Sequence, residues 1–354
     1  MKTAWTKFAA AATVGGAIAL GASGAAAQKY TWKMTNYVPE GTSTYRDYAQ
    51  VFVDLTQSLT DNEVKVQSFG VGVIAGFADG WKAVQQGTAD IAYTFPGFAL
   101  NVDPVNTFPG GFPGGMSTEA LLHWLYQGGG YALWQDFRRQ TTGLHSVLTG
   151  FSPTEIFLHS HKKVETAEDL KGMKIRTAGA WADVLKAFGA TPTMTAPADI
   201  FATLERRLVD ATEYISPASN ISQGFHKIAR YIIVPGAHSP GNINEVVWKA
   251  ETWDGLPKGL RDKLEYAGKM AGYESYLRLG MADIAAMKEM KKGRNEWVSL
   301  KPELILQIRA EGRKWAEAKS KEQADKGNPW MRKFTDSYFA YLQEWEENTA
   351  YRMK

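Results

Sequence analysis

The residues best suited to hold a ligand lie within positions 168–220. Residues 173–176 alternate apolar and polar side chains and predict a short strand that ends at Arg176. A loop of small residues and a helix over 181–188 follow, and ligands of α/β proteins bind beyond the carboxyl ends of strands. The planar donor fork of Arg176 could hold a carboxylate there. Taken alone, an arginine at a strand end is more often a solvated charge.

The same stretch supplies acidic, aromatic and amide candidates. A second helix is predicted over 197–208, and residues 209–214 predict a strand that ends in Glu213 and Tyr214. Glu213 and Arg176 could face one cleft. Trp181 and Asn220 lie at a helix start or in a loop, so each could face this cleft or be structural.

The motifs of this stretch resemble those of one protein family. DLKG at 169–172, KIR at 174–176, PADI at 197–200 and VDATEY at 209–214 are similar to the solute-binding proteins of TRAP transporters. These tripartite ATP-independent periplasmic systems import organic acids. The resemblance implies a periplasmic receptor that binds an organic acid, with Arg176 on its carboxylate, and delivers it to the membrane permease.

A second resemblance narrows the family to a branch. LLHWLYQGGGYALW at 121–134 is most similar to the α-keto-acid-binding branch, whose members carry a similar helix, glycine triplet and Leu-Trp helix. The branch implies a small 2-oxo or 2-hydroxy monocarboxylate as solute. The many aromatic residues leave a bulkier or aromatic carboxylate open.

The branch also implies a metal ion beside the solute, but its ligand set is altered here. A glutamine of the branch aligns with Glu155 when counted back from Arg176, or with Ser152 by the Thr-Gly pair before it. The position of a glutamate beside the metal is Ser239, while Glu213 and Tyr214 match a Glu-Trp pair. No cofactor is certain: sodium or calcium remains an alternative, with Glu213, Tyr214 and Glu155 as candidate ligands. We expect a weak or absent metal requirement.

An exported enzyme is the alternative function. Glu155 and Glu213 could form an acid/base pair that acts on a carboxylate or a glycoside, because sequence does not give their separation. The chain has no G-x-S-x-G elbow, no H-E-x-x-H motif and no cysteine. We therefore expect a binding protein without catalytic residues. A sensory ectodomain would differ only in its partner.

Residues 30–94 predict a βαβαβ unit, with strands over 30–34, 62–69 and 90–94 and helices over 45–60 and 78–86. The aromatic residues after its third strand, Tyr93 and Phe95, are candidates for the cavity wall. They could equally pack beneath the loop that follows.

The amino terminus predicts export. In residues 1–27 two lysines precede an alanine-rich apolar run and an A-x-A cleavage site, as in a secretory signal peptide. Removal of both lysines lowers the formal net charge from +3 to +1, so nothing in the charge favours a nucleic-acid partner. The expected location is the periplasm.

The expected fold class is α/β, a two-lobed periplasmic binding protein (Venus flytrap) with a long helix bracing both lobes. Lobe I comprises 28–152 with a return segment at about 243–270, and lobe II comprises 153–242 with C-terminal helices at about 271–354. One strand over 148–158 should cross between the lobes. The bracing helix covers 257–292, where apolar residues from Leu260 to Met287 recur at near-helical spacing.

The last predicted helices cover 302–319 and 329–349. The second carries an aromatic stripe at helical spacing, formed by Trp330, Phe334, Tyr338, Tyr341 and Trp345. Such a stripe must be buried on the chain's own second lobe or on a partner. The branch exchanges this helix between subunits, so a homodimer through the C-terminal helix is expected.

Overall fold

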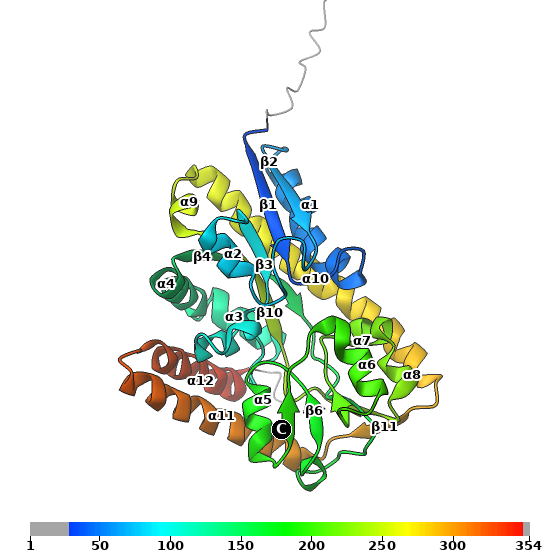
Figure 1. The fold of residues 1–354 in the computed structure, drawn as a ribbon. Helices are drawn as coiled ribbons and strands as arrows, with labels where there is room; N and C mark the ends of the chain where they lie inside the picture. The colour runs from blue at the N-terminus through cyan, green and yellow to red at the C-terminus, as the bar shows by residue number, and fades with distance from the viewer. Residues whose placement is uncertain (1–27, 350–354) are drawn as a thin grey trace, which may run out of the picture.

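The computed structural model describes residues 28–349, and the predicted signal peptide lies outside them. The described chain forms two lobes, each built on its own sheet, with helices packed around them (Figure 1). None of its helices combines the length and apolar character needed to cross a membrane. The expected two-lobed α/β fold is confirmed.

The first lobe contains a five-stranded sheet in the order β2-β1-β3-β10-β4. Its strands are β1 (Tyr30–Asn36), β2 (Val64–Phe69), β3 (Ile91–Thr94), β4 (Leu144–Ser152) and β10 (Asn242–Lys249). β1 pairs in parallel with β2 and β3, whereas β10 runs antiparallel between β3 and β4. The parallel part is the predicted βαβαβ unit, and β10 is the return segment.

The second lobe contains a six-stranded sheet in the order β11-β9-β5-β8-β6-β7. Its strands are β5 (Leu158–Ser160), β6 (Lys174–Arg176), β7 (Thr191–Thr193), β8 (Ala211–Thr212), β9 (Tyr231–Val234) and β11 (Glu296–Ser299). β6 lies between β7 and β8 and is parallel to both. The KIR strand therefore ends at the edge of the sheet that faces the first lobe (Figure 1).

Helices cover the sheets and join the lobes. In the first lobe they are α1 (Gln50–Leu59), α2 (Gly80–Gln86), α3 (Thr118–Tyr126), α4 (Gly130–Thr142) and α9 (Ala250–Asp254). In the second lobe they are α5 (Trp181–Ala187), α6 (Ile200–Glu205), α7 (Pro217–Gln223) and α8 (Phe225–Ile228). The long helices that follow are α10 (Lys258–Lys291), α11 (Pro302–Asp325) and α12 (Trp330–Asn348).

The crossover between the lobes differs from the prediction of one strand over 148–158. β4 ends at Ser152 and β5 begins at Leu158, so residues 153–157 belong to neither sheet. Pro153 follows β4 directly, and proline has no N–H for a ladder hydrogen bond. The break leaves Glu155 on an irregular segment between the two lobes.

Helix α10 braces both lobes as expected, packing on α1 and β4 of the first lobe and on α7 of the second. The apolar repeat that predicted this helix is not buried along its whole length: Met270, Leu277, Met281 and Ile284 are exposed. The buried face instead carries small residues. A Cβ added at Gly268 would lie 2.1 Å from Val147, and one at Gly272 would lie 2.4 Å from Phe151. Larger side chains on this face would push the helix off β4.

The aromatic stripe of α12 is buried on its own chain, but not on the lobe we expected. Trp330, Phe334 and Tyr338 are buried in one cluster with residues of α3, α4 and the loop before α3. The Tyr338 hydroxyl accepts a hydrogen bond from the Met116 backbone N–H at 2.6 Å. α11 packs against both α5 and α12, so the C-terminal pair lies across the two lobes (Figure 1).

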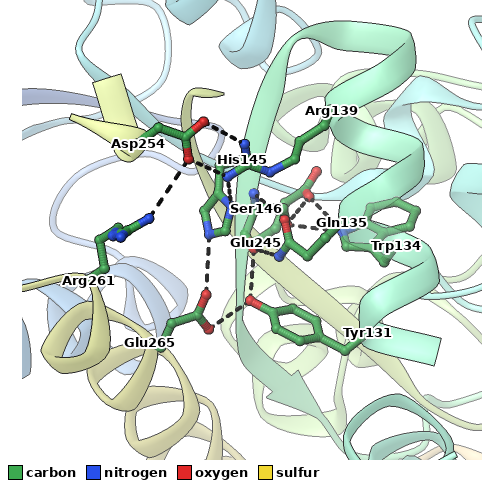
Figure 2. Close-up of polar contacts among 10 residues, drawn as sticks. All are labelled: Tyr131, Trp134, Gln135, Arg139, His145, Ser146, Glu245, Asp254, Arg261 and Glu265. Carbon is green, nitrogen blue, oxygen red and sulfur yellow. Dashed lines mark hydrogen bonds and ion pairs between the residues drawn. The ribbon is translucent and has the colours of Figure 1, made fainter. Parts of the chain in front are cut away.

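A buried ion pair ties α4 to β10 inside the first lobe. Arg138 Nη2 lies 2.6 Å from Glu245 Oε1, and both side chains are 1% exposed. Glu245 Oε2 also accepts hydrogen bonds from Ser146 and Trp134. Beside this pair, a second polar chain links Tyr131 and His145 to Glu265 at the start of α10 (Figure 2). These contacts join α4, β4, β10 and α10 into one unit.

Candidate functional site

A small cavity lies between the lobes, and the volume open to the centre of a water molecule is about 70 Å³. Its walls come from the first lobe, the crossover segments and the second lobe. The lining residues are Tyr37, Tyr48, Phe95, Phe98, Gly110, Gly111, Ser152, Glu155, Arg176, Ala178, Trp181, Glu213, Tyr214, Ile215, His238, Ser239 and Asn242. The cavity is therefore large enough for more than one water molecule, or for a small ligand in their place.

Arg176 is held at the end of β6 by backbone carbonyls. Its Nη1 donates to the Glu213 carbonyl at 2.9 Å, and its Nη2 donates to the Thr195 carbonyl at 3.1 Å. Its guanidinium lies 5.9 Å from the centre of the Tyr214 ring. The buried Nε has no hydrogen-bond partner among the described residues. Arg176 is therefore oriented in advance, with donor capacity left for a ligand.

Three further ionisable groups meet in the cavity. His238 Nε2 lies 3.4 Å from Glu155 Oε2 and 3.9 Å from Glu213 Oε2. The other Glu213 oxygen lies 3.6 Å from Arg176 Nη1 and accepts a hydrogen bond from the Ala178 backbone N–H. All three side chains are buried. The ring of His238 thus lies between two carboxylates.

The loop before His238 is placed by a close backbone contact. A Cβ added at Gly236 would lie 2.2 Å from the carbonyl oxygen of Glu155, so only glycine fits there. The His238 ring packs edge-on against Phe157, at 5.6 Å between centres, and lies 6.0 Å from the Trp181 ring. On the other side, Asn242 Nδ2 donates to Glu155 Oε1 at 3.0 Å. Segments from both crossovers therefore fix the Glu155–His238 pair.

The mutual contacts shift these groups in opposite directions. Burial alone would lower the pKa of His238, but Glu155 and Glu213 outweigh it and raise the pKa to about 9. Burial would raise the pKa of Glu213, yet His238 and Arg176 hold it well below its usual range. For Glu155, burial prevails over His238 and raises the pKa. The two carboxylates therefore favour the charged form of the His238 ring.

The first lobe contributes hydroxyl groups to the wall. The hydroxyls of Tyr48 and Ser152 lie 2.6 Å apart, and the Tyr37 hydroxyl donates to Asn244 Oδ1 at 3.0 Å. Burial raises the pKa of both tyrosines, so they stay neutral and act only through their hydroxyls and rings.

The structure brings seven of the nine predicted site residues together. Those in the lining are Arg176, Glu155, Tyr214, Glu213, Phe95, Trp181 and Ser239, and Ser152, the alternative alignment to Glu155, also lines the cavity. Tyr93 lies outside the lining and packs beneath it, where its ring stacks on Tyr37. Asn220 is also outside: its amide donates to the carbonyls of Tyr214 and Ser216 and so shapes the turn after β8.

Sequence reasoning missed His238, Tyr37, Tyr48 and Asn242. His238 directly precedes Ser239, which the resemblance had singled out, so the adjacent histidine was the available signal. The tyrosines carried no signal of this kind, because a tyrosine in a loop or a helix is most often simply buried.

With the His238 ring in place, the Glu155 and Glu213 carboxylates do not form an all-oxygen site for a calcium or sodium ion. Among residues 28–349, Glu155, Glu213 and His238 form the one group of three potential metal ligands, with donor atoms within 4.8 Å of one another. Hard cations prefer oxygen, and calcium takes roughly six to eight oxygen ligands. Here an imidazole nitrogen lies between the two carboxylates, and Tyr214, the third candidate, offers a neutral phenol whose pKa burial raises to about 12.

The fold and the cavity define a class, the two-lobed solute-binding proteins, and comparison with known proteins specifies the family. Residues 34–322 match the family model of bacterial extracellular solute-binding protein, family 7, and the chain belongs to this family. Proteins of this kind are periplasmic receptors that bind solutes.

One curated relative has a named solute class. A monocarboxylate 2-oxoacid-binding periplasmic protein of Nostoc sp. is 26% identical over 231 residues, which cover 65% of this chain and 63% of the relative. The match thus spans less than two thirds of that relative's length.

Two solved structures share the fold. A TRAP periplasmic solute-binding protein from Pseudoalteromonas atlantica, with bound sodium and pyruvate, has a TM-score of 0.82 and 22% identity, covering 90% of this chain and 96% of that one. A TRAP solute-binding protein from Bordetella bronchiseptica, a dimer with calcium and picolinate, has a TM-score of 0.82 and 19% identity, covering 89% and 92%. These relatives are described as binding proteins, so the enzyme alternative with Glu155 and Glu213 is not supported.

Proposed function

We propose that this protein is the extracytoplasmic receptor of a TRAP transporter, reaching the periplasm through a cleaved signal peptide at 1–27. It binds a small 2-oxo or 2-hydroxy monocarboxylate between its lobes and delivers it to the membrane permease. The observation that carries this proposal is the guanidinium of Arg176, which is buried at the cavity and whose Nε–H has no hydrogen-bond partner within residues 28–349.

The size of the cavity favours a small solute over a bulky one. Only about 70 Å³ is open to the centre of a water molecule, which is little space between the two lobes. A short 2-oxo acid suits this small space. The neighbouring rings of Phe95, Tyr214 and Trp181 then shape the space around the solute rather than leave room for a large aromatic one.

Lobe closure is the mechanism by which binding reaches the permease. A solute can favour the closed form only through contacts that it makes better there. Arg176 and Glu213 lie on the second lobe and Tyr37 and Phe95 on the first, so a solute that touches both walls stabilises closure. The permease then recognises the closed arrangement of the two lobes.

A thermal-shift screen of the mature protein tests the function. Pyruvate, 2-oxobutyrate and lactate are expected to raise the melting temperature at millimolar concentration, whereas picolinate and longer dicarboxylates raise it less. Amines and neutral sugars serve as negative controls. Stabilisation by a neutral sugar with no response to any carboxylate would reject the proposal.

We also propose a homodimer in which α12 is exchanged between subunits. The buried stripe of Trp330, Phe334 and Tyr338 and the short link between α11 and α12 support it, because an exchanged helix would make the same contacts on the partner. The Bordetella bronchiseptica relative is described as a dimer.

Cross-linking can identify the exchange directly. Ser320 Oγ on α11 lies 2.9 Å from Thr335 Oγ1 on α12, and the chain has no cysteine, so S320C with T335C creates a single disulfide pair. An exchanged dimer is expected to run as a covalent dimer on a non-reducing gel and to show a dimer mass by light scattering. A monomer mass would reject the dimer. A dimer mass by light scattering together with a monomer band on the non-reducing gel would place the interface elsewhere, for instance on the exposed apolar residues of α10.

A further inference from the structure

We propose that the His238 ring takes the place of a metal ion in this cavity, so that the solute binds without calcium or sodium and receives an N–H from His238. The inference rests on the proposed function for the solute contact. The Pseudoalteromonas atlantica and Bordetella bronchiseptica relatives are described with sodium or calcium bound.

The cavity holds two buried carboxylates, Glu155 and Glu213, with oxygen atoms within 4.8 Å of each other. Two buried carboxylates this close repel each other, and burial without a nearby cation would force them to take up protons. Arg176 approaches only Glu213, at 3.6 Å, and the sole basic side chain at Glu155 within residues 28–349 is His238. The His238 ring lies between Glu155 and Glu213, at 3.4 and 3.9 Å, in the position where a metal ion would contact both carboxylates.

The neighbours of the His238 ring hold it in this position between the two carboxylates. Phe157 and Trp181 flank it, and the Gly236 backbone is pressed against the Glu155 carbonyl. A Cβ at Gly111 would lie 2.9 Å from Ser239 Oγ, so the segment after the ring is also confined. A metal ion bound by both carboxylates would have to displace the ring and move this whole loop.

The His238 ring also has an N–H donor left for a ligand. Nε2 of His238 faces the two carboxylates, whereas Nδ1 is buried and has no hydrogen-bond partner among the described residues, and the residue lines the cavity. We expect the Nδ1–H of His238 and the Nε–H of Arg176, whose residues both line the cavity, to donate to oxygen atoms of one small carboxylate. This is the work that a metal ion performs when it coordinates a solute oxygen.

Calorimetry with calcium alone tests the replacement without any solute. Purified wild-type protein, treated with a chelator and dialysed into sodium-free buffer, is expected to bind no calcium. The variant H238A uncovers the two carboxylates and is expected to bind calcium, with a rise in melting temperature, and H238A with E155Q is expected to lose that binding. Stoichiometric calcium, zinc or manganese binding by the wild type would overturn the inference.

Titration with pyruvate, or with the carboxylate that gives the largest thermal shift, tests the solute contact. Wild-type affinity should change less than about twofold on chelation or calcium addition, whereas H238A should lose roughly 10- to 150-fold, the usual worth of one charged hydrogen bond. H123Q alters an exposed histidine of α3 outside the cavity and is the control that should bind normally. Normal affinity in H238A would overturn the contact. If no carboxylate binds the wild type with or without metal, the proposed function fails, and the calcium titrations still decide the replacement.

Discussion

Replacement of Arg176 by alanine is expected to weaken carboxylate binding by roughly 30- to several-thousand-fold, or about 2–5 kcal/mol. The solute carboxylate would then be buried without its bidentate partner, beside the negative charge of Glu213. R176K keeps the charge but loses the planar fork, so it should recover only part of the affinity. Isothermal titration of the carboxylate that responds best in the thermal-shift screen is the direct measurement.

The control for this variant is R206A, which removes an exposed arginine of the same lobe. It should bind the solute like the wild type. Because Arg176 also donates to the carbonyls of Glu213 and Thr195, circular dichroism must show that R176A is folded before its affinity is read. A folded R176A with near-native affinity would remove Arg176 from the site.

The second large effect is expected far from the cavity, at the Arg138–Glu245 pair. E245Q would leave the guanidinium of Arg138 buried without a counter-charge, and breaking such a pair from one side costs about 3–5 kcal/mol of unfolding free energy. Urea denaturation followed by tryptophan fluorescence measures this loss. Solute affinity at temperatures where the variant is folded should be nearly unchanged, since Glu245 does not line the cavity.

An exposed ion pair is the matched control for this effect. Arg230 and Glu296 lie 2.8 Å apart, but their side chains are 64% and 54% exposed, so E296Q should change the unfolding free energy by less than about 1 kcal/mol. Adding R138M to E245Q removes the stranded charge and should restore part of the stability. Equal losses in E245Q and E296Q would show that burial does not set the cost of the Arg138–Glu245 pair.

The sequence by itself determined the local elements and the principal ligand-binding candidate. Alternation over 173–176 and the helix that follows predict a strand end, and a strand end in a parallel arrangement must open toward the ligand side of its sheet. The sequence neighbours of Arg176 place it at that strand end, whereas its role as a carboxylate ligand was implied by the family resemblance. The two-lobed fold and the long bracing helix were also predictable, from chain length, motif order and helical spacing.

Only the tertiary structure decided which distant residues meet. Tyr93 and Phe95 are two positions apart after one strand, yet Phe95 lines the cavity and Tyr93 packs under Tyr37. The two residues have nearly the same neighbours in sequence. They differ because the Tyr93 ring stacks on the Tyr37 ring in the folded chain. His238 and Glu155 likewise meet because two crossover segments lie side by side, which no local pattern encodes.

Helix α10 shows the same contrast between what the sequence predicts and what the tertiary structure decides. Spacing predicts that α10 is a helix, but four bulky residues of its apolar repeat, from Met270 to Ile284, are exposed. The face toward β4 must be narrow, because Val147 and Phe151 leave no room for a side chain at Gly268 and Gly272. Hydrophobicity alone ranks leucine above glycine for burial, whereas the distance between packed backbones decides which of them fits.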